Sequence, residues 1–364
     1  MARNTRIDLF AVAVILICIG LVMIYSSSSI YSWERHKDSF FFFKRHFSFL
    51  LIGAVITFFI MGMDYRKLRR YAKPLMAISF VLLLLVLIPG LGREVSGARR
   101  WFRFKMFSFQ PSELATLATL IYVADFIARK GSQIRSFTRG FLPPMLALGG
   151  VVALILIQPD LGTSLALGIV VTIMLFVAGV RPLYILSMFL ASLPALYVLV
   201  FSVPYRAKRI LAFINPWLDP RGIGFQIIQS QIALGSGGLF GVGLGQSKQK
   251  LFYLPAAHTD FIFSIIGEEL GLLGTMGVIV LFMMFIHLGL KIIKNAPNAF
   301  SYFLSLGLVL MITLKAAINI GVSCALLPTK GLPLPFISYG GSSFVFDMVC
   351  LGILLNIART GEYP

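Results

Sequence analysis

Long apolar runs separated by short polar segments dominate the sequence. A helix needs about 20 apolar residues to cross roughly 30 Å of hydrocarbon. The pattern therefore predicts an all-α polytopic integral membrane protein with about ten transmembrane helices. Their approximate cores are residues 9–25, 47–63, 75–89, 114–128, 142–157, 161–180, 183–203, 261–290, 303–327 and 344–357.

Composition excludes several other classes. With 58% hydrophobic residues, mean hydropathy +0.90 and 13% charged residues, the chain lies outside the range of soluble domains. The first apolar run is too long for a signal-peptide core and is predicted to be a retained span. The three cysteines lie within or at the ends of apolar runs and lack metal-site spacing, which argues against disulfides and zinc.

The net charge of +18 comes from basic residues spread over many short loops. This distribution favours membrane lipids or an anionic lipid-linked ligand over nucleic acid. An even number of spans puts both termini on one side of the membrane. Charge counting does not settle which side: if the N-terminus is inside, the inner segments hold about 15 Lys and Arg residues and the outer loops about 16. Six lie in residues 204–259 and five in 93–105, which suggests that they meet phosphate.

The segment 204–259 is too polar and too rich in glycine to cross a membrane, so it is predicted to be a long loop between the seventh and eighth spans. Two pieces, around residues 206–214 and 225–232, show helical apolar spacing and are predicted to lie in the interface. The glycine-rich patch Gly235–Gly245 fits neither nucleotide-binding glycine motif. It is interpreted as mobile backbone that approaches a large substrate.

Asp260 is the first candidate for chemistry. Thr259 can cap a helix that begins at Asp260, and such an aspartate is most often a capping residue. However, Asp260 follows His258 and begins an apolar run of about 31 residues, roughly 45 Å if helical. We expect a helix longer than the bilayer is thick, with Asp260 at its water-facing end.

Two other acidic residues lie at predicted helix starts. Ser112 is predicted to be the N-cap of the fourth span, with Glu113 in its first turn. Asp160 follows Pro159 in a tight turn, where it either caps the next helix or faces the same cavity as the central loop. Asp125 is expected to be a solvated residue at a helix end.

Charged residues inside spans need partners because lipid does not solvate them. At least one of Glu268 and Glu269 should point into the bundle towards a polar or basic group. Lys315 needs a buried acid, and Glu113, Asp347 and the Glu268/Glu269 pair remain alternatives. The last loop, 327–343, is stiffened by prolines and should line a cavity, with Lys330 as its one charge.

Several motifs in order resemble the SEDS family of cell-wall polymerases over nearly the whole chain. They are Gln110–Glu113, Gln158–Gly162, Asn215-Pro216-Trp217 with Asp219-Pro220, Gln226–Ser230, Leu239–Gly245, Leu254–Gly271 and Pro328–Ser343. The context of His258 and Asp260, and the Thr329-Lys330-Gly331 variant, look more like the division and sporulation members than the elongation member.

The resemblance implies a peptidoglycan glycosyltransferase that polymerises lipid II on the outer face of the bacterial cytoplasmic membrane. It implies cytoplasmic termini, a septal location, and partnership with a class B penicillin-binding protein and other divisome proteins. The family aspartate corresponds to Asp260, the expected general base of an inverting transfer from which undecaprenyl pyrophosphate leaves. The side chains expected to neutralise the pyrophosphate are Arg100, Arg206, Arg209, Lys248, Lys250 and Lys330. A divalent cation, Mg²⁺ or Mn²⁺, is a further candidate for this role. Further supporting positions are Glu113, His258, Gln226, Ser338, Ser342 and Asp160.

Three positions depart from the family pattern. Thr116 stands where a lysine often follows the glutamate by one turn, Ala256 replaces a frequent glutamate, and Lys315 stands where glutamine is common. We hypothesise that Glu113 pairs at longer range with Lys315 or Lys330. The alternatives to a polymerase are a lipid II flippase or transporter and a non-catalytic scaffold for a penicillin-binding protein.

Overall fold

The computed structural model describes residues 2–95, 98–104, 107–202, 204–251, 253–329 and 331–360. One helix corresponds to each of the ten predicted spans. These helices are α1 (Ala2–His36), α2 (Phe41–Gly62), α3 (Arg66–Leu85), α4 (Pro111–Lys130), α5 (Leu142–Ile157), α6 (Leu161–Val177), α7 (Pro182–Phe201), α10 (Ile262–Lys294), α11 (Ala299–Ser323) and α12 (Gly341–Thr360).

Seven of the described helices are long and apolar enough to cross a membrane, judged by length and composition. Two of the other three predicted spans differ for identifiable reasons, since α6 has 17 residues and the first half of α3 carries a dense group of basic residues. Near its basic end, α3 therefore suits the membrane surface better than the hydrocarbon. α7 has 20 residues and no charged side chain, as a span requires.

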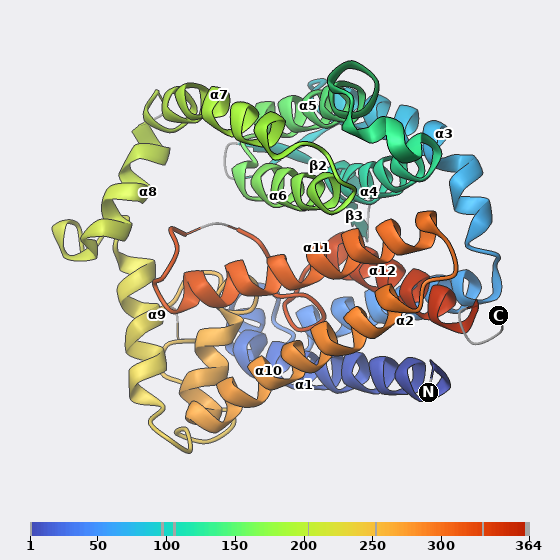
Figure 1. Cartoon of the computed structure of the whole chain (residues 1–364). Coiled ribbons are helices and arrows are strands. Elements are labelled where there is room, and N and C mark those ends of the chain that lie inside the picture. The colour runs from blue at the N-terminus through green and yellow to red at the C-terminus, as the bar shows by residue number, and fades with distance from the viewer. Residues whose placement is uncertain are drawn as a thin grey trace.

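Figure 1 shows both termini at one end of the helix bundle and helices α8 (Pro204–Ile214) and α9 (Phe225–Ser236) at the other. We call these the termini end and the loop end. α4 and α12 bury most of their residues and form the centre, whereas α2 exposes many large apolar side chains. The exposed apolar face of α2 matches a lipid-facing position.

A small sheet at the loop end was not predicted. Strands β1 (Arg93–Val95), β2 (Ala98–Phe104) and β3 (Phe107–Phe109) form an antiparallel sheet in the order β1-β2-β3. The segment is rich in aromatic residues, which favour strands, but each strand is too short to give a clear alternating pattern. The sheet matters because β2 carries Arg100.

The central loop contains the two predicted helices, α8 and α9, joined through a short 3-10 turn, Pro216–Leu218. In that turn the Asn215 side chain accepts a hydrogen bond from the Trp217 amide at 3.1 Å. α9 packs against α10 and α11. The helices are confirmed, and their position in a membrane interface stays a prediction.

The prediction of one continuous eighth span is wrong, because α10 is broken at Gly271. This residue has φ 66° and ψ −161°, so Ile262–Leu270 forms a short helix before the long one. A Cβ at Gly271 would lie 2.3 Å from the Gly241 nitrogen and 2.6 Å from the Leu239 carbonyl carbon. The start of α10 is therefore set by packing, and its length does not place Asp260 above the bilayer.

The glycine-rich patch serves this internal contact, which corrects its interpretation as mobile backbone for substrate. The amides of Val242 and Gly243 donate to the carbonyls of Glu268 and Glu269 at 2.9 and 3.1 Å. A Cβ at Gly241 would lie 2.1 Å from the Glu269 carbonyl oxygen. The patch thus pairs with the exposed backbone at the break, where helical hydrogen bonding is interrupted.

We expect Gly271→Ala to destabilise the protein by about 2 kcal/mol or more, because it adds both a disfavoured positive φ and a backbone clash. The matched control is Gly277→Ala in the same helix, where an added Cβ meets nothing within 4 Å. Thermal unfolding in detergent should show a lower midpoint for Gly271→Ala alone. Equal midpoints for the two variants would contradict the assigned role of the break.

Candidate active site

Asp260 lies at the loop end, just before the short first part of α10. The N-cap of α10 is Phe261 and no side chain caps it, while the Thr259 hydroxyl donates to the Ala256 carbonyl at 3.1 Å. The predicted capping role of Thr259 and Asp260 is therefore wrong. Among the described residues, none forms a hydrogen bond or ion pair with the Asp260 carboxylate, in contrast to a capping role.

The backbone around Asp260 is fixed by the last loop. The Asn319 amide nitrogen donates to the carbonyls of both Asp260 and Leu332, at 2.9 and 2.8 Å. The Ser338 hydroxyl donates to the Thr259 carbonyl at 2.6 Å. Asn319 was not among the predicted site residues, although an asparagine inside an apolar span is itself a signal.

The electrostatic environment of Asp260 comes from three separated segments. Burial raises the pKa of Asp260 to about 6, while the positive charges of Arg209 and Arg100 oppose this rise and the negative charge of Asp160 adds to it. The structure therefore brings together these four predicted site residues. A carboxyl with a pKa near neutrality suits general-base work.

Backbone carbonyls hold the two arginines. Arg100 donates to the carbonyls of Gln158 and Pro159 at 2.7 and 2.5 Å, and Arg209 donates to the Thr329 carbonyl at 3.0 Å. Backbone carbonyls orient these guanidinium groups without removing their positive charge.

Asp160 caps α6, which is one of its two predicted roles, because its side chain accepts a hydrogen bond from the Thr163 backbone amide at 3.2 Å. It also accepts from the Gln110 side chain at 3.4 Å, and its charge acts on Asp260. Ser342 joins this group by accepting from the Gln110 amide at 3.2 Å. The capping alternative for Asp160 is therefore confirmed, and its exposure to a shared cavity stays a prediction.

His258 lies among aromatic rings rather than charges. Its ring centroid is 4.8 Å from that of Phe42 and 5.7 Å from those of Tyr31 and Tyr339. Burial lowers the pKa of His258 to about 4, so its imidazole is neutral at neutral pH. His258 is thus a packing neighbour of the site and not a pyrophosphate-binding cation.

A buried triad confirms the hypothesis that Glu113 pairs with Lys315. The Lys315 Nζ lies 2.9 Å from Glu113 Oε2 and 3.4 Å from Asp347 Oδ1. α4 begins at Pro111 with Gln110 as N-cap, which corrects the prediction that Ser112 caps it. Glu113 is therefore held in the first turn of α4 by α11 and α12.

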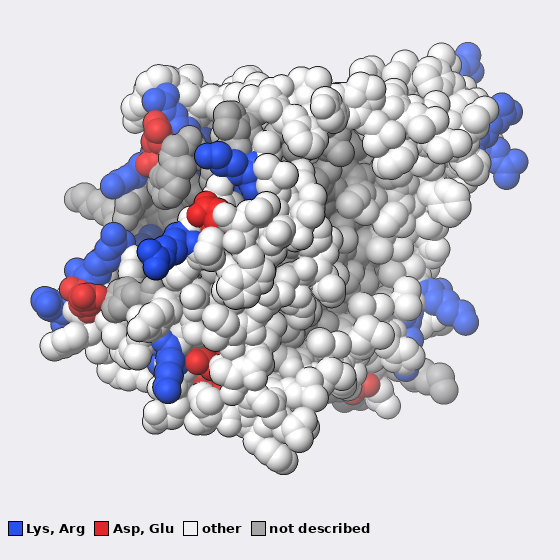
Figure 2. Space-filling model, turned by 90° about the vertical axis from the view of Figure 1, so that its left-hand side faces the viewer, with Lys and Arg blue, Asp and Glu red and all other residues white. Residues whose placement is uncertain are grey.

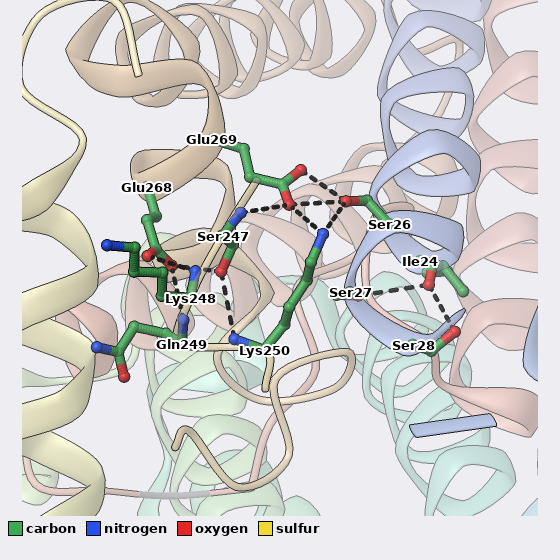
Figure 3. Close-up of polar contacts among 10 residues, drawn as sticks. All are labelled: Ile24, Ser26, Ser27, Ser28, Ser247, Lys248, Gln249, Lys250, Glu268 and Glu269. Atoms are coloured by element: carbon green, nitrogen blue, oxygen red, sulfur yellow. Dashed lines mark hydrogen bonds and ion pairs between the residues drawn. The ribbon is translucent and has the colours of Figure 1, made fainter. Parts of the chain in front are cut away.

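A second buried network contradicts the predicted role of Lys250 (Figure 3). Lys250 Nζ lies 2.9 Å from Glu269 Oε1, and the same carboxylate accepts from the Ser26 hydroxyl of α1. Glu268 accepts from the Ser247 hydroxyl and from the backbone amides of residues 248 and 249. Lys250 is an internal counter-ion, and both glutamates are held within the protein as predicted.

The remaining predicted residues divide into three groups. Lys248 is exposed, and Gln226 is half-buried with no hydrogen bond to a described residue. Lys330 and the side chain of Arg206 lie outside the described residues. Asp125, predicted to be solvated, is buried and lies 2.9 Å from both Arg69 and Arg129, because the last turn of α4 packs against α3.

Figure 2 shows the loop end as a surface. Basic side chains gather on the left of this face with acidic groups between them, and further basic side chains lie along its right-hand edge.

Comparisons with known proteins agree on the family. The model for FtsW, RodA and SpoVE, described as "Cell cycle protein", matches residues 6–363. The chain belongs to this family.

Two relatives illustrate the family's range. The chain is 48% identical to the "Probable peptidoglycan glycosyltransferase FtsW" of Geobacter metallireducens, covering 95% of this chain and 92% of the relative. It is 45% identical to "Stage V sporulation protein E" of Bacillus subtilis, covering 99% of both.

A solved structure shares the fold. One chain of "Structural coordination of polymerization and crosslinking by a peptidoglycan synthase complex" aligns with a TM-score of 0.81 at 30% identity over 98% of both chains. Together with the seven helices capable of spanning, family membership makes this a multi-pass membrane protein.

The side chains near Asp260 could bind the predicted divalent cation only in part. No three potential metal-ligating side chains gather anywhere in the described ranges. Asp260 and Asp160 are near enough for their charges to interact. Mg²⁺ is usually bound by one or two carboxylates together with substrate phosphates, so the donor set fits a cation that arrives with a pyrophosphate.

Lys250→Met should destabilise the protein by about 3–5 kcal/mol, because it leaves Glu269 buried and unpaired. Adding Glu269→Gln should recover part of this loss. The control is Lys248→Met, two residues away and exposed, which should change stability by less than about 0.5 kcal/mol. Thermal unfolding in detergent measures all three, and equal effects at both lysines would contradict the internal role of Lys250.

Proposed function

We propose that this chain is a peptidoglycan glycosyltransferase that polymerises lipid II with Asp260 as general base. The observation that carries the proposal is the half-buried carboxylate of Asp260, which pairs with no described residue and lies within the electrostatic reach of Arg100 and Arg209. A carboxylate kept free at a half-buried position costs stability, and such costs concentrate at functional sites. The names of the relatives support the same reaction.

In the proposed reaction, the sugar hydroxyl of one lipid-linked disaccharide attacks the anomeric carbon of another. The new glycosidic bond forms as the bond to undecaprenyl pyrophosphate breaks, and the pyrophosphate leaves with the electron pair. Asp260 takes the hydroxyl proton. One carboxylate is sufficient because a single displacement inverts the anomeric centre and needs no covalent intermediate.

Arg100 and Arg209 are the proposed pyrophosphate-binding cations. Charge-assisted bonds from fixed guanidinium groups stabilise the negative charge that develops on the leaving group. We also propose that a divalent cation bound with the pyrophosphate by Asp160 or Asp260 would add positive charge there. Lys248 and Gln226 remain proposed supporting residues, with Lys330 and Arg206.

The cellular setting is proposed from the relatives. We propose cytoplasmic termini, which put Asp260 at the outer face of the cytoplasmic membrane, and a role in septal synthesis during division or sporulation. A class B penicillin-binding protein is the proposed partner, because the solved complex named above couples polymerisation to crosslinking. Other divisome proteins and membrane lipids complete the proposed partners.

We expect Asp260→Asn to abolish glycan polymerisation from labelled lipid II, since the amide cannot accept the proton. Loss of a general base typically reduces the rate by about 10²–10⁴-fold. The variant should not unfold at a lower temperature than the wild type. The pKa of Asp260 is raised in the folded protein, so folding favours a neutral side chain at this position more than the unfolded chain does. Gel separation of glycan products, with the partner present, measures the loss.

One control variant and the behaviour of Asp260→Asn separate this function from its alternatives. Thr259→Ser retains a hydroxyl beside Asp260 and should keep activity near that of the wild type. Glycan ladders of equal intensity from wild type and Asp260→Asn would end the general-base assignment. A flippase would retain lipid II transport in the variant, and a scaffold would tolerate the substitution entirely.

A further inference from the structure

The termini end carries a cavity that the glycosyltransferase site does not use. It has a volume of about 400 Å³ and lies where α3, α4 and α11 meet. Its lining consists of Arg66, Arg69, Ala128, Asn298, Ala299 and Phe300. Asp260 is at the opposite end of the bundle, so the cavity is a separate feature.

The charge balance of this cavity is positive. Asp125 is the neighbouring acid, and it is already shared by Arg69 and Arg129 at 2.9 Å each. The Arg66 side chain is exposed and forms no ion pair with any described residue, while Asp64 accepts from the backbone amide of Arg66. Two arginines therefore line the cavity, and the one neighbouring carboxylate, which Arg129 also shares, does not balance their charge.

The backbone adds donors in the same place. Ala299 and Phe300 are the first two residues of α11, where amide groups have no carbonyl one turn earlier to accept from them. The Asn298 side chain satisfies the Ser301 amide at 2.9 Å and donates to the Tyr65 hydroxyl at 2.6 Å. The cap is thus complete without a partner for the amides of Ala299 and Phe300, two of the residues that line the cavity.

The cavity also lies at the ends of three helices, where lipid headgroups are expected. Arg66 begins α3, Ala128 is in the last turn of α4, and Ala299 begins α11. Membrane-spanning helices end near the headgroup region, and basic pockets between such helices bind the head groups of anionic lipids. A binding site for a soluble anion would not need to lie near the headgroup region.

From the cavity, its unpaired guanidinium and its depth, we infer that this pocket binds the phosphate of an anionic phospholipid headgroup. We call it the termini-end pocket. Arg66 contacts the phosphate directly, and Arg69, held by Asp125, fixes the second charge. The proposed cytoplasmic position of the termini would place this lipid in the cytoplasmic leaflet. The pocket itself does not depend on that orientation.

The test is isothermal titration of the full chain in a neutral detergent with short-chain phosphatidylglycerol. Phosphatidylcholine of equal chain length and inorganic phosphate are the comparison ligands. Wild type should bind phosphatidylglycerol at least about tenfold more tightly than either comparison ligand. Equal affinity for inorganic phosphate would overturn the lipid assignment, and so would equal affinity for phosphatidylcholine.

Arg66→Gln should weaken phosphatidylglycerol binding by about tenfold, since it removes a charge-assisted contact. The matched control is Lys67→Gln, which removes the same charge from the next residue, outside the lining. It should change the affinity by less than about twofold. Equal losses in the two variants would show general attraction to positive charge and overturn the proposed pocket.

A second variant guards against misfolding of Arg66→Gln. Ala299→Glu places a carboxylate in the first turn of α11, where the helix dipole favours it, yet this carboxylate would pair with the arginines and exclude phosphate. It should fold and lose binding. Asp260→Asn should bind phosphatidylglycerol like the wild type, so this inference and the proposed glycosyltransferase function can fail separately.

Discussion

The break of α10 at Gly271 is the constraint on which the loop end depends. At this point the backbone takes a conformation that glycine adopts most readily, and the resulting gap in helical hydrogen bonding is filled by residues 237–243. The break leaves a short helix with Asp260 just before its start and Glu268 and Glu269 near its end. The glycines of the central loop thereby help to fix the backbone that carries the proposed base.

Paired charges then hold this arrangement inside an apolar bundle. Lys250 with Glu269 joins the central loop to α10 and, through Ser26, to α1. Lys315 with Glu113 and Asp347 joins α4, α11 and α12. Because each pair is buried, removal of one partner leaves an unsolvated charge. The carboxylate of Asp260 contrasts with these paired acids, and that contrast supports its chemical role.

The sequence predicted elements that depend on local patterns and missed those that depend on distant packing. The ten spans and the α8 and α9 helices follow from apolar runs and helical spacing. A lysine inside a span, such as Lys315, needs an acidic partner, so its pairing could also be predicted. Lys250 looked like an outward-facing cation because its partner, Glu269, meets it only after the chain turns back at the break. The position of Asp125 likewise depends on how α3 crosses α4.

The site itself was predicted unevenly. Asp260 was identified through its motif, since its local context suggested only a cap. Its electrostatic neighbours come from β2, the start of α6 and α8, and no local pattern relates these segments. Asn319 shows the general limit most clearly, because one side chain amide fixes two carbonyls, those of Asp260 and Leu332. The effect depends on a contact between distant segments that the sequence does not encode locally.

The pH dependence of kcat/KM for lipid II polymerisation tests the central claim most directly. The account predicts an acid limb near pH 6, with activity rising as Asp260 loses its proton. Arg209→Gln should move this limb to higher pH, because Arg209 lowers the pKa of Asp260. A profile that stays flat from about pH 5 to pH 8 would contradict Asp260 as the base, and so would a limb that Arg209→Gln leaves unmoved.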